Sequence, residues 1–401
     1  MSLSPQLESL KLEAMQTSCE AWAMRRRWVL ARGIDRAGPC PKCGGDDRFA
    51  IHTKKNTFNC RGCGIHGAGV IDLVMQTEGL EFVKACEVIT GRTAEAPVDL
   101  ARSAHLAREA AHEKAERAQQ EQRYRDAARK SAYNIWSKQA FRAPREGFVA
   151  QYFDRRGISF ARVVELVEET GAVLQLREIE RQPWLEKRGD IWSTLHEGPV
   201  MVACVQRPDG TFGAVHQTWL DLTQPKGKLV LPPIEEAGAD GVIKQVDRPT
   251  KKVLGVKKGG AIRLFTPREA RRLVVGEGIE TTATALVHAF EPGTAYWAAV
   301  DLGNMAGKCA RDANGHRIED QPDMTDEDCF VPPDWCEEAI YLCDDDDARN
   351  HTEEKVVRGL KRALLQREAA RAKDLSLPAL TVSYVPPLGG GMDLNDLVRV
   401  G

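Results

Sequence analysis

The stretch CPKCGGDDRFAIHTKKNTFNCRGCG, residues 40–64, carries four cysteines in two Cys-x-x-Cys pairs. Sixteen residues, 44–59, separate the pairs, and glycines follow both of them. Two such pairs can hold one zinc ion tetrahedrally, and the small residues let backbone amides approach the sulfurs. Coincidence among the 11 cysteines of the chain is the alternative, but the symmetry of the pairs speaks against it. The spacing therefore predicts a β zinc ribbon with four thiolate ligands to a structural zinc ion: Cys40, Cys43, Cys60 and Cys63.

The residues around this ribbon are basic and aromatic. Lysine and arginine neutralise phosphates, and exposed rings stack on bases. We therefore expect nucleic-acid contacts from four residues: Arg48, Lys54, Lys55 and Arg61. The two lysines have a second interpretation as the solvated tip of a hairpin. Phe49 and Phe58 fit the core of the ribbon better than a stacking surface.

The bulk composition fits a soluble protein of more than one domain. The chain has 401 residues, 56 Lys and Arg against 58 Asp and Glu, and a formal charge of −2. Because that balance gives no overall positive field, a nucleic-acid partner requires local basic patches. The odd number of cysteines and the lack of a secretory signal indicate a reducing, cytoplasmic setting. No apolar stretch is long enough to cross a bilayer, so we expect no membrane partner.

The pattern along the chain predicts an α+β multidomain fold. We expect N-terminal helices over 1–37, the zinc-binding domain over 38–95, a helical linker over 96–142, a basic first part of an α/β core over 143–265, and the rest of that core over 266–401. Gly79 and Gly91 are the expected stops of two helices after the ribbon. The segment 99–141 has no Gly or Pro and only a thin apolar stripe, which favours a solvated spacer helix over a coiled-coil dimer.

Acidic residues follow predicted strands in the last third of the chain. From about residue 271, apolar strands and helices alternate, which predicts a largely parallel sheet covered on both faces. Glu277 lies in RLVVGEGIETT, Asp344 to Asp347 in AIYLCDDDDARN, and Asp393 in LGGGMDLNDLV. The carboxyl ends of parallel strands share one edge, where clustered carboxylates repel unless a hard cation such as magnesium joins them. Taken singly, each cluster has another interpretation as the acidic first turn of a helix.

These motifs resemble those of the Toprim fold, which bacterial-type primases and topoisomerases share. VVGEGIETT, the four-aspartate run and GGGMDLND resemble its acidic motifs, and CPKCGGDDRF with CRGCGIHGAGVIDLV resembles the zinc-binding domain of phage and plasmid primases. The resemblance covers about residues 38–91 and 145–400. It assigns the motif glutamate to Glu277, the Asp-x-Asp pair to Asp344 and Asp346, and a weaker final motif to Asp393.

Two departures from the family pattern stand out. The second zinc ligand of the best-known bacterial primases is histidine, whereas it is Cys43 here. The usual Asp-Gly-Asp is here Asp344-Asp345-Asp346, which leaves open which residues of the run Asp344 to Asp347 bind metal.

A basic segment, KKVLGVKKGGAIRL, lies just before the strand predicted ahead of Glu277. Its glycines would let the backbone approach phosphates, and in the resembling primases a basic segment here handles template and nucleotides. We expect such contacts from Lys251, Lys252, Lys257, Lys258 and Arg263, with a solvated loop as the alternative. The chain has no G-x-x-x-x-G-K-[ST] motif, so we expect no ATP-driven helicase within it.

The resemblance implies a DNA primase, a DNA-directed RNA polymerase, of a phage, plasmid or other mobile element. Such an enzyme joins ribonucleoside triphosphates into short RNA primers on single-stranded DNA, with Mg²⁺ or Mn²⁺ at Glu277, Asp344, Asp346 and Asp393. Glu277, Asp344 and Asp346 would be the catalytic residues, and a separate replicative helicase the expected partner. Two alternatives stay open: a Toprim-type metal-dependent nuclease, and a non-catalytic replication factor that only binds DNA.

Overall fold

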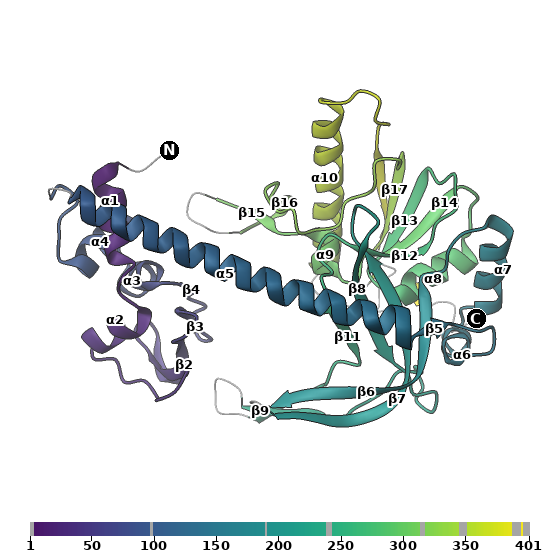
Figure 1. The fold of residues 1–401 in the computed structure, drawn as a ribbon, viewed down its shortest axis with the longest axis horizontal. Coiled ribbons are helices and arrows are strands. Elements are labelled where there is room, and N and C mark those ends of the chain that lie inside the picture. Colours follow the sequence, from purple (N-terminus) through teal and green to yellow (C-terminus); the bar gives the residue numbers. More distant parts are fainter. Residues whose placement is uncertain are drawn as a thin grey trace. The chain divides into compact units, whose positions relative to one another are not determined.

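The computed structural model describes residues 4–96, 99–188, 191–237, 243–312, 317–344, 351–386 and 394–395. The chain divides into two compact units: Met1–Glu121 with Pro232–Asp247, and Gln122–Leu231 with Arg248–Gly401. Their helices and strands are labelled in Figure 1.

The first unit contains the ribbon and its helices. Its strands β1 to β4 form one antiparallel sheet in sequence order. The elements are α1 (Pro5–Ala14), α2 (Cys19–Arg25), β1 (Asp35–Cys40), β2 (Gly44–His52), β3 (Thr57–Cys60), β4 (His66–Ala68), α3 (Val70–Glu78), α4 (Phe82–Thr90), the first part of α5 (Leu100–Asn134), and the hairpin β9 (Ile234–Ala237) and β10 (Ile243–Val246).

The core of this unit joins the ribbon to the helices. Phe49, Ile51 and Phe58 of the sheet pack with Trp22 of α2 and Leu73 of α3, and each of these side chains is at most 3% exposed. The predicted core role of Phe49 and Phe58 is thus confirmed. Burying these large apolar side chains stabilises the small sheet.

Backbone conformation explains where the helices of the first unit end. Gly79 and Gly91 follow α3 and α4 with φ of 67° and 73°, a left-handed conformation that glycine adopts without a Cβ clash. These predicted stops are confirmed. The helices expected over 1–37 end earlier, at Arg25, because Arg27 takes a φ of 55° and the chain leaves the helical conformation there.

A long helix is present in the segment of the predicted spacer: α5, which continues into a π-helical turn, η1 (Ile135–Gln139). Most of α5 is exposed. The segment forms a helix because it is rich in Ala, Glu and Arg and contains no helix breaker. The helix belongs to the first unit up to Glu121 and to the second from Gln122.

The second unit is built on a ten-stranded mixed sheet. Strands run in the order β11-β8-β7-β12-β14-β13-β17-β18, and β6 with β5 is added beside β7. The further elements are β5 (Phe141–Arg142), α6 (Phe148–Arg155), α7 (Phe160–Thr170), β6 (Leu176–Arg188), β7 (Ile191–Gln206), β8 (Phe212–Trp219), β11 (Lys251–Gly255), β12 (Ala261–Phe265), β13 (Arg272–Gly276), α8 (Ile279–His288), β14 (Thr294–Ala298), α9 (Leu302–Ala306), β15 (Cys309–Arg311), β16 (Arg317–Pro322), β17 (Glu338–Leu342), α10 (His351–Arg371) and β18 (Thr381–Val385).

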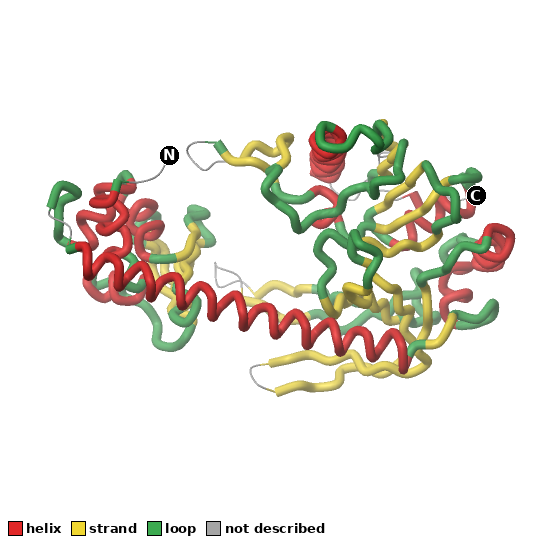
Figure 2. Tube along the Cα trace, turned by 45° about the horizontal axis from the view of Figure 1, so that its top comes forward, coloured by secondary structure: helices red, strands yellow, loops and turns green. Residues whose placement is uncertain are grey.

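Helices cover both faces of this sheet (Figures 1 and 2). Alternate strand residues enter two different cores: Val274 packs on the side of α6, α7 and α8, whereas Leu273 and Val275 pack on the side of α9 and α10. This period of two follows from the pleat of a strand. The predicted strand–helix alternation after residue 271 is therefore confirmed.

The parallel strands bring their carboxyl ends to one edge. In β13 and β14, Gly276 lies opposite Ala298, and in β13 and β17, Val275 lies opposite Tyr341. The residues that follow these three strands must therefore gather at the same edge, and this register positions the candidate site.

Candidate functional site

The four cysteines of the ribbon meet at one point. The Sγ atoms of Cys40 and Cys63 are 3.8 Å apart and those of Cys43 and Cys60 are 3.6 Å apart, and all four lie within 4.8 Å of one another. A tetrahedral zinc with sulfur bonds of about 2.3 Å needs edges of roughly 3.8 Å. The cluster fits that geometry and could hold one structural zinc ion, as the spacing predicted.

Backbone groups and one arginine surround these sulfurs. The amide of Lys42 donates to Cys40 Sγ at 3.4 Å and that of Gly62 to Cys60 Sγ at 3.3 Å. Burial raises the pKa of Cys40 to about 12. Burial also acts to raise the pKa of Cys60, but hydrogen bonds from backbone amides outweigh it and lower that pKa to about 7. Amide donors stabilise the thiolate form, which is the form that binds metal.

Arg48 explains two of the glycines that follow the cysteine pairs. A Cβ on Gly45 would lie 2.2 Å from Arg48 Nε, and one on Gly62 would lie 2.6 Å from Arg48 Cδ. The arginine side chain therefore packs over both turns, close to the sulfurs. Lys54 and Lys55 lie exposed at the β2–β3 turn, and Arg61 donates to the carbonyl of Asp47 at 3.2 Å. Nucleic-acid contact by these residues stays a prediction.

Three carboxylates follow the carboxyl ends of β13, β14 and β17. They are Glu277, Asp301 and Asp344. The Thr281 hydroxyl in the first turn of α8 donates to Asp344 Oδ2 at 2.9 Å and thereby joins the two predicted acidic motifs. Asp346 and Asp393, two of the predicted metal ligands, lie outside the described residues. Asn395 is fully buried and donates to Thr284 of α8 at 3.1 Å, so the segment just after Asp393 lies against the same helix.

The turn that carries Asp301 has an unusual backbone. Val300 takes a φ of 77°, which is a rare conformation for a β-branched residue. Such outliers persist where the surroundings hold them, and they gather at functional sites. Asp301 caps α9 by accepting from the amide of Asn304 at 2.8 Å, and it also pairs with Lys257.

A buried glutamate beside this edge was not among the predicted site residues. Glu280 is 5% exposed; Lys228 Nζ lies 2.8 Å and Lys251 Nζ 3.6 Å from its oxygens, and the Tyr152 hydroxyl donates to it at 2.5 Å. Burial alone would raise the pKa of Glu280, but the two lysines outweigh it and hold that pKa well below its usual range. Glu280 raises the pKa of Lys251, whereas burial lowers the pKa of Lys228. The negative charge of Glu277 also raises the pKa of Lys251.

Two polar groups of β8 face the same interior. In the antiparallel pairing of β8 and β11, Thr218 lies opposite Lys251 and His216 lies opposite Val253. His216 Nδ1 and Thr218 Oγ1 are buried and have no hydrogen-bond partner among the described residues. Burial, with Lys251 as the next cause, lowers the pKa of His216 to about 4, so the ring is neutral near pH 7.

The other basic residues of the predicted segment point to different places. Lys252 lies 3.4 Å from the centre of the Trp184 ring, on the opposite face of β11. Arg263 lies 4.6 Å from the centre of the Trp297 ring and donates to the carbonyl of Arg207 at 2.9 Å. Two members of this segment therefore lie near the acidic residues at the strand ends: Lys251 beside Glu280, and Lys257 paired with Asp301.

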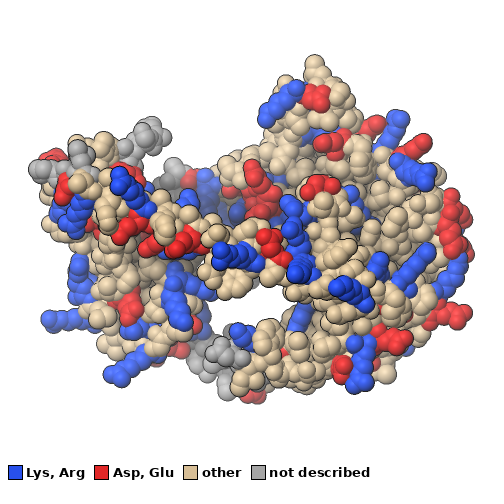
Figure 3. Space-filling view, viewed as in Figure 1, with Lys and Arg blue, Asp and Glu red and all other residues tan. Residues whose placement is uncertain are grey.

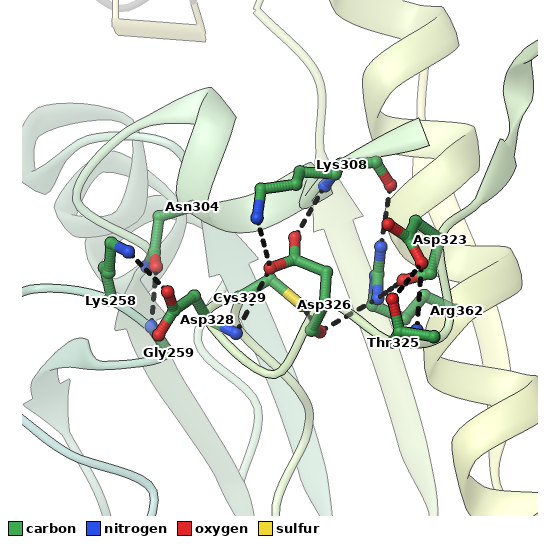
Figure 4. Close-up of polar contacts among 10 residues, drawn as sticks. All are labelled: Lys258, Gly259, Asn304, Lys308, Asp323, Thr325, Asp326, Asp328, Cys329 and Arg362. Atoms are coloured by element: carbon green, nitrogen blue, oxygen red, sulfur yellow. Dashed lines mark hydrogen bonds and ion pairs between the residues drawn. The ribbon is translucent and has the colours of Figure 1, made fainter. Parts of the chain in front are cut away.

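The loop that carries Asp323, Asp326 and Asp328 lies beside the turn of Lys258 and Gly259 (Figure 4). Lys258 pairs with Asp328, and Asn304 Oδ1 accepts from the amide of Gly259 at 2.8 Å. Asp326 in turn accepts from the amide of Lys308 at 2.8 Å, and the buried Arg362 of α10 donates to the carbonyls of Asp323 and Lys308. The turn is thus a fixed part of the fold.

On the face seen in Figure 3, positive and negative side chains are interspersed on both units. Within the described parts of the chain, no helix has the length and apolar character needed to span a membrane.

Comparison with known proteins gives one family match and several structural likenesses. Residues 126–264 match the family described as "Domain of unknown function (DUF7146)". None of the curated proteins matches the sequence.

The structural likenesses are to primases. The Aquifex aeolicus primase (zinc-binding and RNA polymerase domains) is 13% identical over 98% of this chain and 82% of its own, with a TM-score of 0.27. The primase fragment of the bacteriophage T7 primase-helicase is 12% identical over 93% and 96%, with a TM-score of 0.27. A DNA primase domain from Pseudomonas aeruginosa is 13% identical over 69% and 73%, with a TM-score of 0.34. Values this low carry no argument about activity, so the function is argued from the chain's own residues.

Proposed function

We propose that this protein is a DNA primase whose second unit contains a Toprim-type catalytic core. One observation carries the proposal: Glu277, Asp301 and Asp344 follow three neighbouring parallel strands, and Lys251 faces the same place. Carboxylates next to a lysine suit a reaction in which metal ions and phosphates meet.

The metal ligands in this proposal are Glu277, Asp344, Asp346 and Asp393. Bound Mg²⁺ or Mn²⁺ would lower the pKa of an attacking hydroxyl and stabilise the leaving pyrophosphate. The Thr281 hydroxyl donates to Asp344 Oδ2 at 2.9 Å and so restricts the orientation of this carboxylate. Asp301 offers a further oxygen at the same edge, although Lys257 now pairs with it.

The lysines beside Glu280 are the proposed contacts for the triphosphate. Glu280 is buried and holds Lys228 and the more exposed Lys251 together, so the two positive charges are only partly screened by water. A triphosphate at the strand ends would meet positive charge that the fold has already positioned, and such preorganisation is the main source of catalysis in phosphoryl transfer.

The ribbon unit is the proposed template-binding module. Its lysines Lys54 and Lys55 are exposed at a hairpin tip, and Arg61 lies beside the metal cluster. These residues suit contacts to the phosphates of single-stranded DNA. We place the protein with the primases of phages, plasmids and other mobile elements, acting beside a separate helicase, because of the motif resemblance described above.

Primer synthesis on single-stranded DNA tests the proposal. Wild-type protein with ribonucleotides and magnesium or manganese should give short RNA products, whereas Asp344→Ala/Asp346→Ala should give none. Asp320→Ala is the matched control, because Asp320 is an exposed residue of β16, outside the large sheet, and pairs with Lys361 of α10. Cleavage of the DNA without nucleotides would favour a nuclease instead, and binding without any reaction would favour a replication factor.

A further inference from the structure

A cavity of about 470 Å³ lies in the second unit between η1, β5, the end of α7 and the start of β6. Its walls include Trp136, Arg142, Val167, Leu174 and Arg177. No acidic residue is among the described residues that line it. The volume lies within the range of small-ligand sites.

Two arginines face each other at this cavity. Arg142 of β5 lies directly opposite Arg177 of β6 in the antiparallel pairing. Like charges in such a pair destabilise a sheet unless an anion lies between or beside them. Glu178, the adjacent residue of β6, is 2% exposed and accepts from the amide of Val149 at 3.0 Å, so its carboxylate is engaged with α6.

The π-helical turn holds one of these arginines against a ring. Arg177 Cζ lies 4.2 Å from the centre of the Trp136 ring, and its Nη1 donates to the Trp136 carbonyl at 2.5 Å. In a π-helical turn the hydrogen bonds are shifted by one residue, and such turns occur frequently at functional sites. The result is a stack of guanidinium on indole, with Arg142 beside it. The Arg142 side chain makes no hydrogen bond or ion pair within the described parts of the chain.

We propose that this cavity binds one nucleotide unit, with its phosphate on Arg142 and its base extending the stack of Trp136 and Arg177. Bases stack on tryptophan rings and on arginine planes, and arginine suits phosphate through its planar set of donors. Val167 and Leu174 supply the apolar surface that a base would cover. A simple anion would use the arginines but leave this aromatic and aliphatic surface exposed.

The source of the nucleotide unit follows from the proposed function, on which this step rests. A primase template is a single strand, and the cavity would hold one of its nucleotides away from the strand-end carboxylates. Free nucleotide has the same chemistry and is the other source to distinguish. Because the cavity lies within residues 126–264, the proposal also gives a role to the domain of unknown function matched there.

Oligonucleotide binding by the full chain tests the proposal. We expect Arg142→Ala to weaken binding of a fluorescein-labelled single-stranded DNA about tenfold, since one charge-assisted contact is lost. The slope of log affinity against log salt should fall by about 0.7. Arg145→Ala is the matched control: Arg145 is also exposed, but it pairs with Glu168 at 2.7 Å and does not line the cavity.

A second measurement locates the base. Oligonucleotides that carry 4-thiothymidine are cross-linked by light, and the attached peptide is identified by mass spectrometry. We expect a cross-link at Trp136, and competition by unlabelled oligonucleotide but not by millimolar nucleoside triphosphate. Competition by the triphosphate alone would retain the site and assign it to free nucleotide. Unchanged binding by Arg142→Ala together with no cross-link at Trp136 would overturn the proposal.

These results are separable from the proposed function. A wild-type protein that makes no primers but binds DNA through Arg142 would refute the primase proposal and keep the nucleotide site. If the wild-type protein makes primers, and Arg142→Ala matches it in DNA binding and in cross-linking, the primase proposal stands and the nucleotide site is refuted.

Discussion

Replacing Glu280 by glutamine should destabilise the second unit strongly. The variant keeps the size of the side chain but leaves Lys228 and Lys251 without their shared counter-charge. Removing one partner of a buried ion pair typically costs about 3–5 kcal/mol. Lys251 is 40% exposed and is partly screened by water, so the lower end of that range, about 3 kcal/mol, is expected.

The stability difference between wild type and Glu280→Gln depends on pH. Because the pKa of Glu280 is held well below its usual range in the folded state, its contribution is present above the unfolded pKa of about 4.3 and is lost as the pH falls through the folded value. Wild type and Glu280→Gln should therefore differ most near pH 7 and converge in strong acid. Tyr152→Phe removes only the hydroxyl that donates to Glu280 and should cost about 2 kcal/mol.

The assay is urea-induced unfolding followed by hydrogen exchange of peptides from the second unit, so that unfolding of the first unit does not contribute. A loss below about 1 kcal/mol at pH 7, or a difference that stays the same at pH 3, would refute the description of Glu280 as a charged group held by two lysines.

Three further results are expected. Chelation of zinc, or Cys60→Ser, should unfold the ribbon and release one zinc ion per chain in a dye assay, while peptides of the second unit keep their exchange protection, because the two units have separate cores. His216, with its pKa lowered to about 4 against about 6.5 when unfolded, should lower the stability of the fold by about 2 kcal/mol between pH 6.5 and 5; His216→Gln should lose that sensitivity in the same urea titrations. Asp328→Asn should free Lys258 and tighten single-stranded DNA binding two- to fivefold (about 0.4–1 kcal/mol), with Asp320→Asn unchanged; equal affinities would show that Lys258 does not contact DNA.

Local signals in the sequence were sufficient for most of the elements. Gly79 and Gly91 ended their helices because glycine takes the left-handed conformation, and the cysteine spacing placed four sulfurs within reach of one ion. Strand–helix alternation after residue 271 predicted the edge that carries Glu277 and Asp344, since parallel strands end on the same side.

The buried charge network could not be predicted in this way. Glu280 stands in the first turn of a helix, where an acidic residue usually serves the helix dipole in solvent. Its partners Tyr152, Lys228 and Lys251 come from three distant parts of the chain, and their meeting depends on tertiary packing. A signal was present in GIETTATAL, where Glu280 falls within a run of otherwise small or apolar residues typical of a buried helix.

Primer synthesis by Glu277→Gln, measured beside Glu337→Gln, is the decisive test of a catalytic role for the carboxylates at the strand ends. Both changes neutralise one carboxylate of the same sheet, but Glu337 precedes β17 at the opposite edge and lies exposed. Glu277→Gln should abolish ribonucleotide incorporation on single-stranded DNA at every magnesium or manganese concentration, whereas Glu337→Gln should be as active as wild type. Full activity of Glu277→Gln would contradict a catalytic metal site at the carboxyl ends of β13 and β17.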